Sequence, residues 1–235
     1  MFLAVPCPCR RWNENARTEM LACLPMAGAV AGGFWALAAW LTDLFPCPIP
    51  LRALLLAAFP WAVSGFMHLD GFLDVCDAVL SRRDLATRQK ILKDPHCGSF
   101  AVICLILLAM GQWSLFWSAE SLPLLSLAVI PVATRACAGL AVLSLRPMGS
   151  SQYVRMNQAK CKGKRFFLFA LLLLAVCVAV LLEGWAGCAP LLAGAVYALA
   201  VFYGRRQLDG MSGDISGFAL TLGELAGVAV VTLVR

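Results

Sequence analysis

Long apolar runs with few or no charges recur along this chain, and their length is the feature that most restricts its fold. Seven of them approach the roughly 20 residues that a helix needs to cross a bilayer. They are Met20–Leu41, Leu51–Phe66, Gly98–Trp117, Leu122–Leu145, Phe166–Leu182, Cys188–Tyr203 and Ile215–Val234. Lipid offers the backbone no hydrogen-bond partners, and the alternating polarity of a membrane barrel is missing. The sequence therefore predicts an all-α, polytopic integral membrane protein with about seven transmembrane helices.

The composition supports one membrane-embedded domain over residues 1–235. Hydrophobic residues make up 61% of the chain and charged residues 14%, whereas soluble domains contain about 25% charged residues. The apolar runs follow one another closely, which leaves no room for a separate soluble domain. Membrane lipid is thus an expected partner, and the oligomeric state stays open.

The basic residues are distributed unevenly between the two predicted membrane faces. Sixteen of the 19 Lys and Arg residues precede the first run or fall in the segments 67–97, 146–165 and 204–214. The positive-inside rule therefore predicts a cytoplasmic N-terminus and three cytoplasmic catalytic loops in a plasma (inner) membrane. Because the charges are spread over several loops, nucleic acid is not an expected partner. The basic loop 146–165 suits anionic lipid and a phosphorylated substrate equally.

Three aspartates follow one another at helical spacing after the second apolar run. Asp70, Asp74 and Asp77 stand at positions i, i+4 and i+7, so on a helix they lie within about 60° of one another. Carboxylates gathered in this way repel one another unless a cation lies among them. Oxygen ligands suit Mg²⁺, which typically shares its coordination with water and substrate phosphates. The spacing predicts a magnesium site, and the alternative is a solvated loop whose acids offset nearby arginines.

Lys93 and Asp94 bring a cation and another carboxylate to the same predicted face. Asp94 is a candidate metal ligand, and Lys93 can hold a phosphate as a point charge. The alternative is that Lys93 anchors the chain at the lipid surface and Asp94 caps the following helix. His68 and His96 are the only histidines, and neither has a second histidine at ligand spacing, which argues against zinc.

The last predicted cytoplasmic loop reads DGMSGD and leads directly into the final apolar run. Gly210 and Gly213 allow the backbone to approach a ligand, and the following helix N-terminus offers N–H groups to a phosphate. Asp214 is a further candidate metal ligand, and the alternative is that it only caps the last helix.

Two opposite charges stand alone inside apolar runs. Glu224 lies ten residues into the last predicted span, and Arg135 lies within the fourth. Unpaired charges are costly there. Either the two form a structural pair or Arg135 reaches a substrate phosphate, so both are candidate ligand-binding residues.

These motifs together resemble the cobalamin synthase family over nearly the whole chain. Residues 64–78 read SGFMHLDGFLDVCDA, residues 92–98 read LKDPHCG, and residues 209–217 read DGMSGDISG; LPMAG at residues 24–28 matches near the start. The chain departs from the family at Ser64, Ala78 and Asp209, where glycine is usual, and at Ser212, where threonine is usual. Every acidic position of the motifs is retained, so these departures concern loop geometry more than chemistry.

The resemblance implies an adenosylcobinamide-GDP ribazoletransferase. Such an enzyme joins adenosylcobinamide-GDP and α-ribazole, or its 5′-phosphate, and releases GMP. In that reaction Mg²⁺ held by Asp70, Asp74, Asp94 and Asp214 would neutralise the diphosphate. The motif positions make Asp77, His68 and Lys93 the candidate catalytic residues, with Asp77 as the base by analogy with membrane CDP-alcohol phosphotransferases.

Two other functions remain as alternatives. A CDP-alcohol phosphotransferase acting on lipid shares the acidic motif, but the glycines, aspartate and Ala-Arg pair that follow it in that class are not found here. A transporter would carry acids along a path through the membrane. Nine of the 13 acidic residues instead fall in predicted cytoplasmic segments, which favours chemistry at the membrane face.

Overall fold

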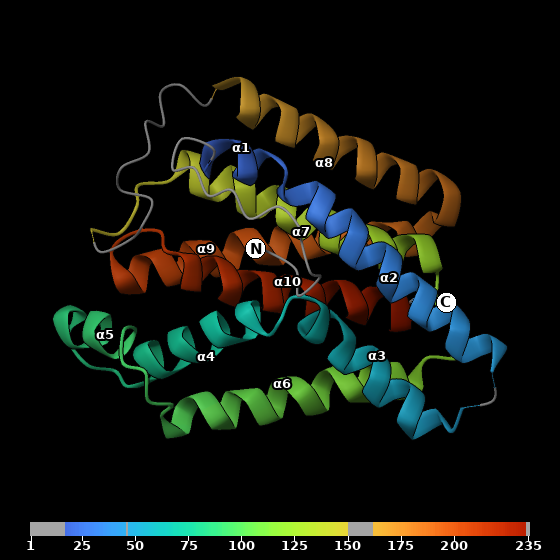
Figure 1. Cartoon of the computed structure of the whole chain (residues 1–235), viewed down its shortest axis with the longest axis horizontal. Coiled ribbons are helices and arrows are strands. Elements are labelled where there is room, and N and C mark those ends of the chain that lie inside the picture. Colours follow the sequence, from blue (N-terminus) through green and yellow to red (C-terminus); the bar gives the residue numbers. More distant parts are fainter. Residues whose placement is uncertain (1–16, 46, 150–161, 234–235) are drawn as a thin grey trace, which may run out of the picture.

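The computed structural model describes residues 17–45, 47–149 and 162–233, which fold into helices joined by short connections. Their bounds are α1 Arg17–Ala22, α2 Leu24–Leu44, α3 Ile49–Val63, α4 Met67–Leu80, α5 Leu85–Ile91, α6 Ser99–Ser118, α7 Leu124–Ser144, α8 Lys162–Glu183, the 3₁₀ turn Gly184–Cys188, α9 Ala189–Leu208 and α10 Gly213–Leu233. The long helices lie roughly side by side in one bundle (Figure 1). The expected all-α class is therefore confirmed.

The described helices also confirm a membrane protein. Five stretches are long and apolar enough to cross a bilayer, and α3 with α4 adds a sixth when this bent pair is taken as one span. One of the five, Lys162–Leu208, contains both α8 and α9, which run in opposite directions in Figure 1. Large apolar side chains such as Leu107, Leu181 and Leu199 are exposed on the outside of the bundle. Such a surface is stable only against lipid.

The second predicted span is where the structure differs most from the expectation. Helix α3 has 15 residues, about 22 Å at 1.5 Å per residue, which is shorter than the bilayer core. Gly65 and Phe66 adopt positive φ angles of 62° and 60°, and α4 leaves this turn at 91° to α3. The acidic motif consequently lies on a helix inside the bundle rather than in an open loop.

The predicted catalytic loops also have different bounds in the structure from those expected from the sequence. Helix α9 continues to Leu208, so only residues 209–212 connect it to α10. Of the segment 146–165, residues 150–161 lie outside the described part of the chain. The predicted loop 67–97 contains α4 and α5, because its apolar residues pack against neighbouring helices.

Helices α7 and α10 form the centre of the bundle. In both helices, 67% of the apolar stretch is buried inside the bundle, compared with 22% of the apolar stretch of α6. Helix α2 packs closely on α7 because Gly28 and Gly32 lie four residues apart on its contact face. A Cβ atom at Gly32 would lie 1.9 Å from the Ala128 carbonyl oxygen, so this small-residue face allows direct backbone contact.

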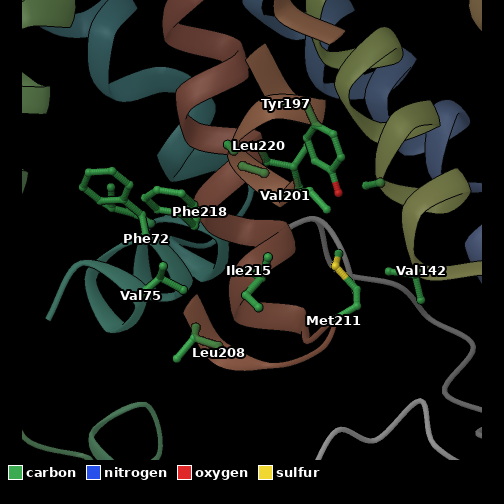
Figure 2. Close-up of a cluster of buried hydrophobic side chains, with 14 of the residues drawn as sticks. Phe72, Val75, Val142, Tyr197, Val201, Leu208, Met211, Ile215, Phe218 and Leu220 are labelled. Atoms are coloured by element: carbon green, nitrogen blue, oxygen red, sulfur yellow. The ribbon is translucent and has the colours of Figure 1, made fainter. Parts of the chain in front are cut away.

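A second glycine pair brings α4 against α10. A Cβ atom at Gly71 would lie 2.9 Å from the Asp214 Cα and carbonyl oxygen, and one at Gly217 would lie 2.9 Å from the His68 carbonyl oxygen. Phe72 and Phe218 stack beside this crossing, with ring centroids 5.7 Å apart. Figure 2 shows these rings with the side chains of α9 and α10 that complete the core. The crossing fixes α4 and its acidic residues against the start of α10.

Replacing Gly71 with alanine tests this crossing. Gly71→Ala should destabilise the protein by about 1–3 kcal/mol, because the new methyl group meets the α10 backbone rather than a movable side chain. Gly111→Ala is the matched control, since a Cβ atom there has no atom within 4 Å and alanine favours a helix. Thermal unfolding in detergent measures both variants. Equal melting temperatures for the two would contradict the close crossing.

Candidate active site

An acidic cavity of about 270 Å³ lies between α4 and the segment that precedes α6. Asp70, Asp74 and Asp77 line it from α4, and residues 91–98 form the opposite wall. The i, i+4, i+7 spacing places the three carboxylates on one face of α4, which turns toward this cavity. The structure thus brings the three acidic residues to one cavity, and Lys93 and Asp94 line it from the other side.

Like charges crowd around Asp74. This half-buried carboxyl group interacts electrostatically with Asp70 and Asp77 on its own helix and with Asp214 at the start of α10. The Gly71–Gly217 crossing produces this arrangement, because it holds the first turn of α10 directly against α4. Such a cluster attracts a cation strongly.

Helix α5 holds the opposite wall of the acidic cavity in place. Arg88 donates from Nη1 to the Gln207 backbone oxygen at 3.2 Å, and Gln89 donates from Nε2 to the Leu208 backbone oxygen at 2.8 Å. Asp84 caps α5 by accepting a hydrogen bond from the Thr87 backbone N–H at 3.1 Å. These contacts tie α5, and hence residues 91–98, to the end of α9.

Asp94 makes a local turn rather than capping α6. Its Oδ1 accepts a hydrogen bond from the His96 backbone N–H at 3.0 Å and lies 2.7 Å from His96 Nδ1. These contacts with His96 lower the pKa of Asp94, so the carboxylate is charged at neutral pH. The residue that caps α6 is Gly98. The capping alternative for Asp94 is therefore wrong.

Asp77 lies against the start of α6. A Cβ atom at Gly98 would lie 2.0 Å from Asp77 Oδ2 and 2.2 Å from Oδ1, so any larger residue there would displace the carboxylate. The first backbone N–H groups of a helix attract negative charge. Asp77 thus lines the acidic cavity from a position beside the α6 N-terminus.

Ser212, and not Asp214, caps α10. Its hydroxyl oxygen accepts a hydrogen bond from the Ile215 backbone N–H at 3.2 Å and donates to Asp214 Oδ2 at 3.3 Å. Serine supplies the same hydroxyl as threonine, so this departure from the family pattern keeps the cap. Asp214 is consequently available to the site.

A second cavity of about 190 Å³ adjoins these acids inside the bundle. Asp70, Asp214 and Gly213 line this inner cavity together with His68 and Arg135. His68 Nε2 is buried and has no hydrogen-bond partner among the described residues. A buried polar nitrogen that borders a cavity needs a water or a ligand group to bond to. Asp70 lines both cavities and so connects them.

Arg135 and Glu224 form a buried ion pair. Arg135 Nη1 lies 2.5 Å from Glu224 Oε1, and the two residues are only 1% and 4% exposed. Arg135 also donates to the Pro131 carbonyl oxygen at 3.4 Å. The structural pairing is therefore present, and Arg135 borders the inner cavity at the same time. Glu224 affects the inner cavity indirectly, because it holds the Arg135 side chain in place.

Gly210 has a packing role away from the acidic cavity. Its φ of 142° suits glycine, and a Cβ atom there would lie 2.6 Å from Met148 Cα. Met148 and Met211 pair nearby, with the Met148 N–H donating to the Met211 carbonyl oxygen at 2.9 Å. Asp209 takes a φ of 57°, a conformation that aspartate tolerates better than most residues. Gly210 lines a separate basic cavity with Asp209.

The donor set fits one kind of metal site. Among the described residues, no three acidic, histidine or cysteine side chains converge closely enough to enclose a metal ion by themselves. The cavity nevertheless offers several carboxylate oxygens, and Mg²⁺ commonly takes one or two carboxylates and completes its shell with water and phosphate. The residues therefore fit a cation shared with a substrate, and they do not fit a closed protein cage.

Comparison with known proteins agrees with this geometry. Residues 1–232 match the cobalamin-5-phosphate synthase family. The chain belongs to this family. Most residues that line the acidic cavity and the inner cavity of this cobalamin synthase family member belong to the motifs that carry the family resemblance in its sequence, and Arg135 is an exception.

Relatives of this cobalamin synthase family member extend over its whole length. Each of the following is named adenosylcobinamide-GDP ribazoletransferase. The Clostridium perfringens strain 13 protein is 30% identical over 238 residues, covering 100% of this chain and 95% of the relative. The Clostridium botulinum strain Alaska E43 protein is 32% identical, covering 97% and 92%. The Geobacillus kaustophilus protein is 32% identical, covering 97% and 91%. No solved structure matches the chain.

Sequence reasoning missed the groups that position the acids. Nothing in the spacing of His96 indicated that it bonds to Asp94, and nothing indicated that Gly98 makes room for Asp77. The partners of Arg135 and Glu224 were named as alternatives only because both charges stand in apolar runs. The Asp94–His96 contact is local, whereas contacts between distant segments decide the positions of Asp77, Arg135 and Glu224.

Removing one member of the buried pair tests its contribution. Glu224→Leu should destabilise the protein by about 3 kcal/mol or more, because it leaves the Arg135 charge buried without its partner. The double variant Arg135→Met with Glu224→Leu should recover most of this loss, since no unpaired charge remains. Thermal unfolding in detergent measures both. A single variant as stable as wild type, or a double variant no better than the single one, would contradict the pairing.

Proposed function

We propose that this protein is an adenosylcobinamide-GDP ribazoletransferase. Its family membership and the shared name of its full-length relatives support this activity. The observation that carries the proposal is the acidic cavity, where carboxylates from α4 face Lys93 on the opposite wall, with Asp214 of α10 within electrostatic reach of Asp74. A diphosphate substrate needs both kinds of group. The carboxylates bind a metal ion, and this ion and the cationic side chain together neutralise the charge of the diphosphate.

The reaction transfers the cobinamide phosphate from its GDP ester to the acceptor. A hydroxyl oxygen of α-ribazole, or of its 5′-phosphate, forms a bond to the phosphorus that carries cobinamide. The bond from this phosphorus to the bridging oxygen breaks, and GMP leaves with that oxygen. The hydroxyl proton passes to a carboxylate of the site. Mg²⁺, when bound, supplies positive charge that neutralises the diphosphate and the leaving phosphate.

Each candidate residue has a proposed role in this reaction. Asp70, Asp74 and Asp214 would supply carboxylate ligands to a metal ion whose shell is completed by water and substrate phosphate, because they come from the two helices that the glycine crossing joins. Asp94 is a further oxygen ligand on the opposite wall, and Lys93 beside it holds a substrate phosphate.

The proton acceptor and the inner cavity complete the proposal. Asp77 accepts the proton of the attacking hydroxyl, since it lines the acidic cavity near Lys93 and Asp94. His68 offers its unpartnered Nε2 as a hydrogen-bond partner for a substrate group in the inner cavity. Arg135, oriented by Glu224, supplies a positive charge to the same cavity.

We also propose that the acidic cavity faces the cytoplasm from a plasma (inner) membrane. The described parts of the predicted cytoplasmic segments lie at the end of the bundle where α4 meets α5 and α9 meets α10 (Figure 1). The positive-inside rule favours this orientation, with the N-terminus on the same side. The donor carries a diphosphate and would reach the site from water.

The alternatives have less support from the geometry. A transporter path needs acids along the membrane depth, whereas Asp70, Asp74, Asp77 and Asp94 gather in one cavity and Glu224 is bound to Arg135. A lipid-directed CDP-alcohol phosphotransferase shares the acidic motif, but family and relatives favour the cobinamide substrate.

Charge-neutral substitutions test the assignment. Asp74→Asn should lower kcat by roughly 10²-fold or more, because it removes a carboxylate that stabilises the metal and the developing charge. The measurement supplies purified protein in detergent with adenosylcobinamide-GDP, α-ribazole 5′-phosphate and Mg²⁺, and follows GMP release together with the cobalamin product.

Asp84→Asn is the matched control. Asp84 caps α5 at the same end of the bundle, and asparagine is an equally good cap, so this variant should keep near-wild-type activity. An active Asp74→Asn protein would remove the proposed role of Asp74. Absence of both products with the wild-type protein, although it is folded and supplied with Mg²⁺, would overturn the proposed function itself.

A further inference from the structure

Two cavities away from the acidic site meet at the end of α9. One is an apolar groove of about 420 Å³ between α7 and α9. Its walls include Leu140, Ala141 and Ser144 of α7 and Ala198, Val201 and Phe202 of α9. The other is the basic cavity of about 360 Å³, lined by Arg146, Arg205, Arg206, Asp209 and Gly210. Arg205 lines both cavities and so joins them.

The groove runs along helices that span the membrane. Both α7 and α9 belong to stretches long and apolar enough to cross a bilayer, and they run in the same direction, so their C-terminal ends lie at one end of the bundle (Figure 1). Tyr197 and Arg205 lie eight positions apart on α9, so the groove follows this helix for about 12 Å at 1.5 Å per residue. A hydrocarbon chain is the natural occupant of a groove with small apolar walls in this position.

The basic cavity carries more positive than negative charge. Three guanidinium groups line it with one carboxylate, and that carboxylate belongs to the Arg146–Asp209 pair, whose Nη2 and Oδ2 atoms lie 3.1 Å apart. Arg206 packs over the Phe202 ring, with its guanidinium carbon 4.3 Å from the ring centroid. This contact holds one cation directly above the groove. Arginine groups at a membrane face favour anionic headgroups.

We propose that the groove and the basic cavity together bind one anionic phospholipid. An acyl chain lies between α7 and α9, and the headgroup phosphate bonds to Arg205 and Arg206. The two requirements of such a ligand, an apolar tail and an anionic head, are met in adjoining cavities that share Arg205. This inference does not depend on the proposed reaction, because the acidic cavity and the inner cavity contribute none of these residues.

The headgroup contact is tested with a charge-removing variant. Delipidated protein in detergent is offered phosphatidylglycerol and phosphatidylcholine, and native mass spectrometry counts the bound lipid. Wild type should retain phosphatidylglycerol in preference. Arg205→Gln should weaken phosphatidylglycerol binding roughly tenfold, since one charge-assisted hydrogen bond is lost. Arg83→Gln, an exposed arginine between α4 and α5, is the matched control and should bind as wild type does.

The groove is tested by filling it. Ala198→Phe places a ring where the acyl chain should lie and should lower lipid retention, whereas Ala195→Phe, exposed on the same helix, should not. Equal binding of both lipids, or wild-type binding by both Arg205→Gln and Ala198→Phe, would overturn the proposal. Displacement of phosphatidylglycerol by millimolar glycerol 3-phosphate or α-ribazole 5′-phosphate would also overturn it, because the cavity would then serve a soluble phosphate ester.

Discussion

The direct backbone contact of α4 with α10 is the constraint on which the rest of the site depends. Gly71 and Gly217 remove the side chains that would keep these helices apart, and the stacked Phe72 and Phe218 rings secure the crossing. Asp214 is thereby placed within electrostatic reach of Asp74. Two motifs more than 130 residues apart in the sequence become one site because neither has a side chain at the crossing point.

The apolar helix bundle accommodates the charges of the α4 acids and of Arg135 and Glu224 in two different ways. The acids of α4 border a cavity at the end of the bundle, where water and a cation can reach them. Arg135 and Glu224 are almost fully buried and neutralise each other. An intramembrane ion pair is expensive to form, so its presence next to the inner cavity is consistent with a functional requirement for the arginine.

The attachment of α5 to α9 adds a third element to the site. Arg88 and Gln89 bond to the end of α9, and the wall with Lys93 and Asp94 follows directly from α5. The acidic cavity therefore opens between two rigid groups of helices, α4 with α10 on one side and α5 with the start of α6 on the other. The loop between α9 and α10 adds the Ser212 cap that orients the first turn of α10.

The sequence predicted the class of fold and the shared helical face of the three α4 acids well, because both depend on local patterns. Long apolar runs require membrane helices, and the spacing of Asp70, Asp74 and Asp77 places them on one helical face whatever the helix packs against. The broken α3–α4 span could not be predicted from hydropathy, since the positive φ angles of Gly65 and Phe66 interrupt a run that remains apolar throughout.

Positions that depend on packing were less accessible to sequence reasoning. Asp94 was given a capping alternative that Gly98 fulfils instead, and nothing in the sequence indicated that Gly210 makes room for Met148. The pairing of Arg135 with Glu224 was one of two alternatives, because sequence shows that each charge needs a partner but not how the two helices are rotated. Local sequence patterns do not specify contacts that depend on how helices pack.

Electron paramagnetic resonance with Mn²⁺ in place of Mg²⁺ tests the central claim most directly, namely that α4 and α10 jointly hold a cation on the donor diphosphate. With adenosylcobinamide-GDP bound, the account predicts a ³¹P hyperfine coupling in the wild-type spectrum that is lost in both Asp74→Asn and Asp214→Asn. A coupling that persists unchanged in either variant would contradict the shared site.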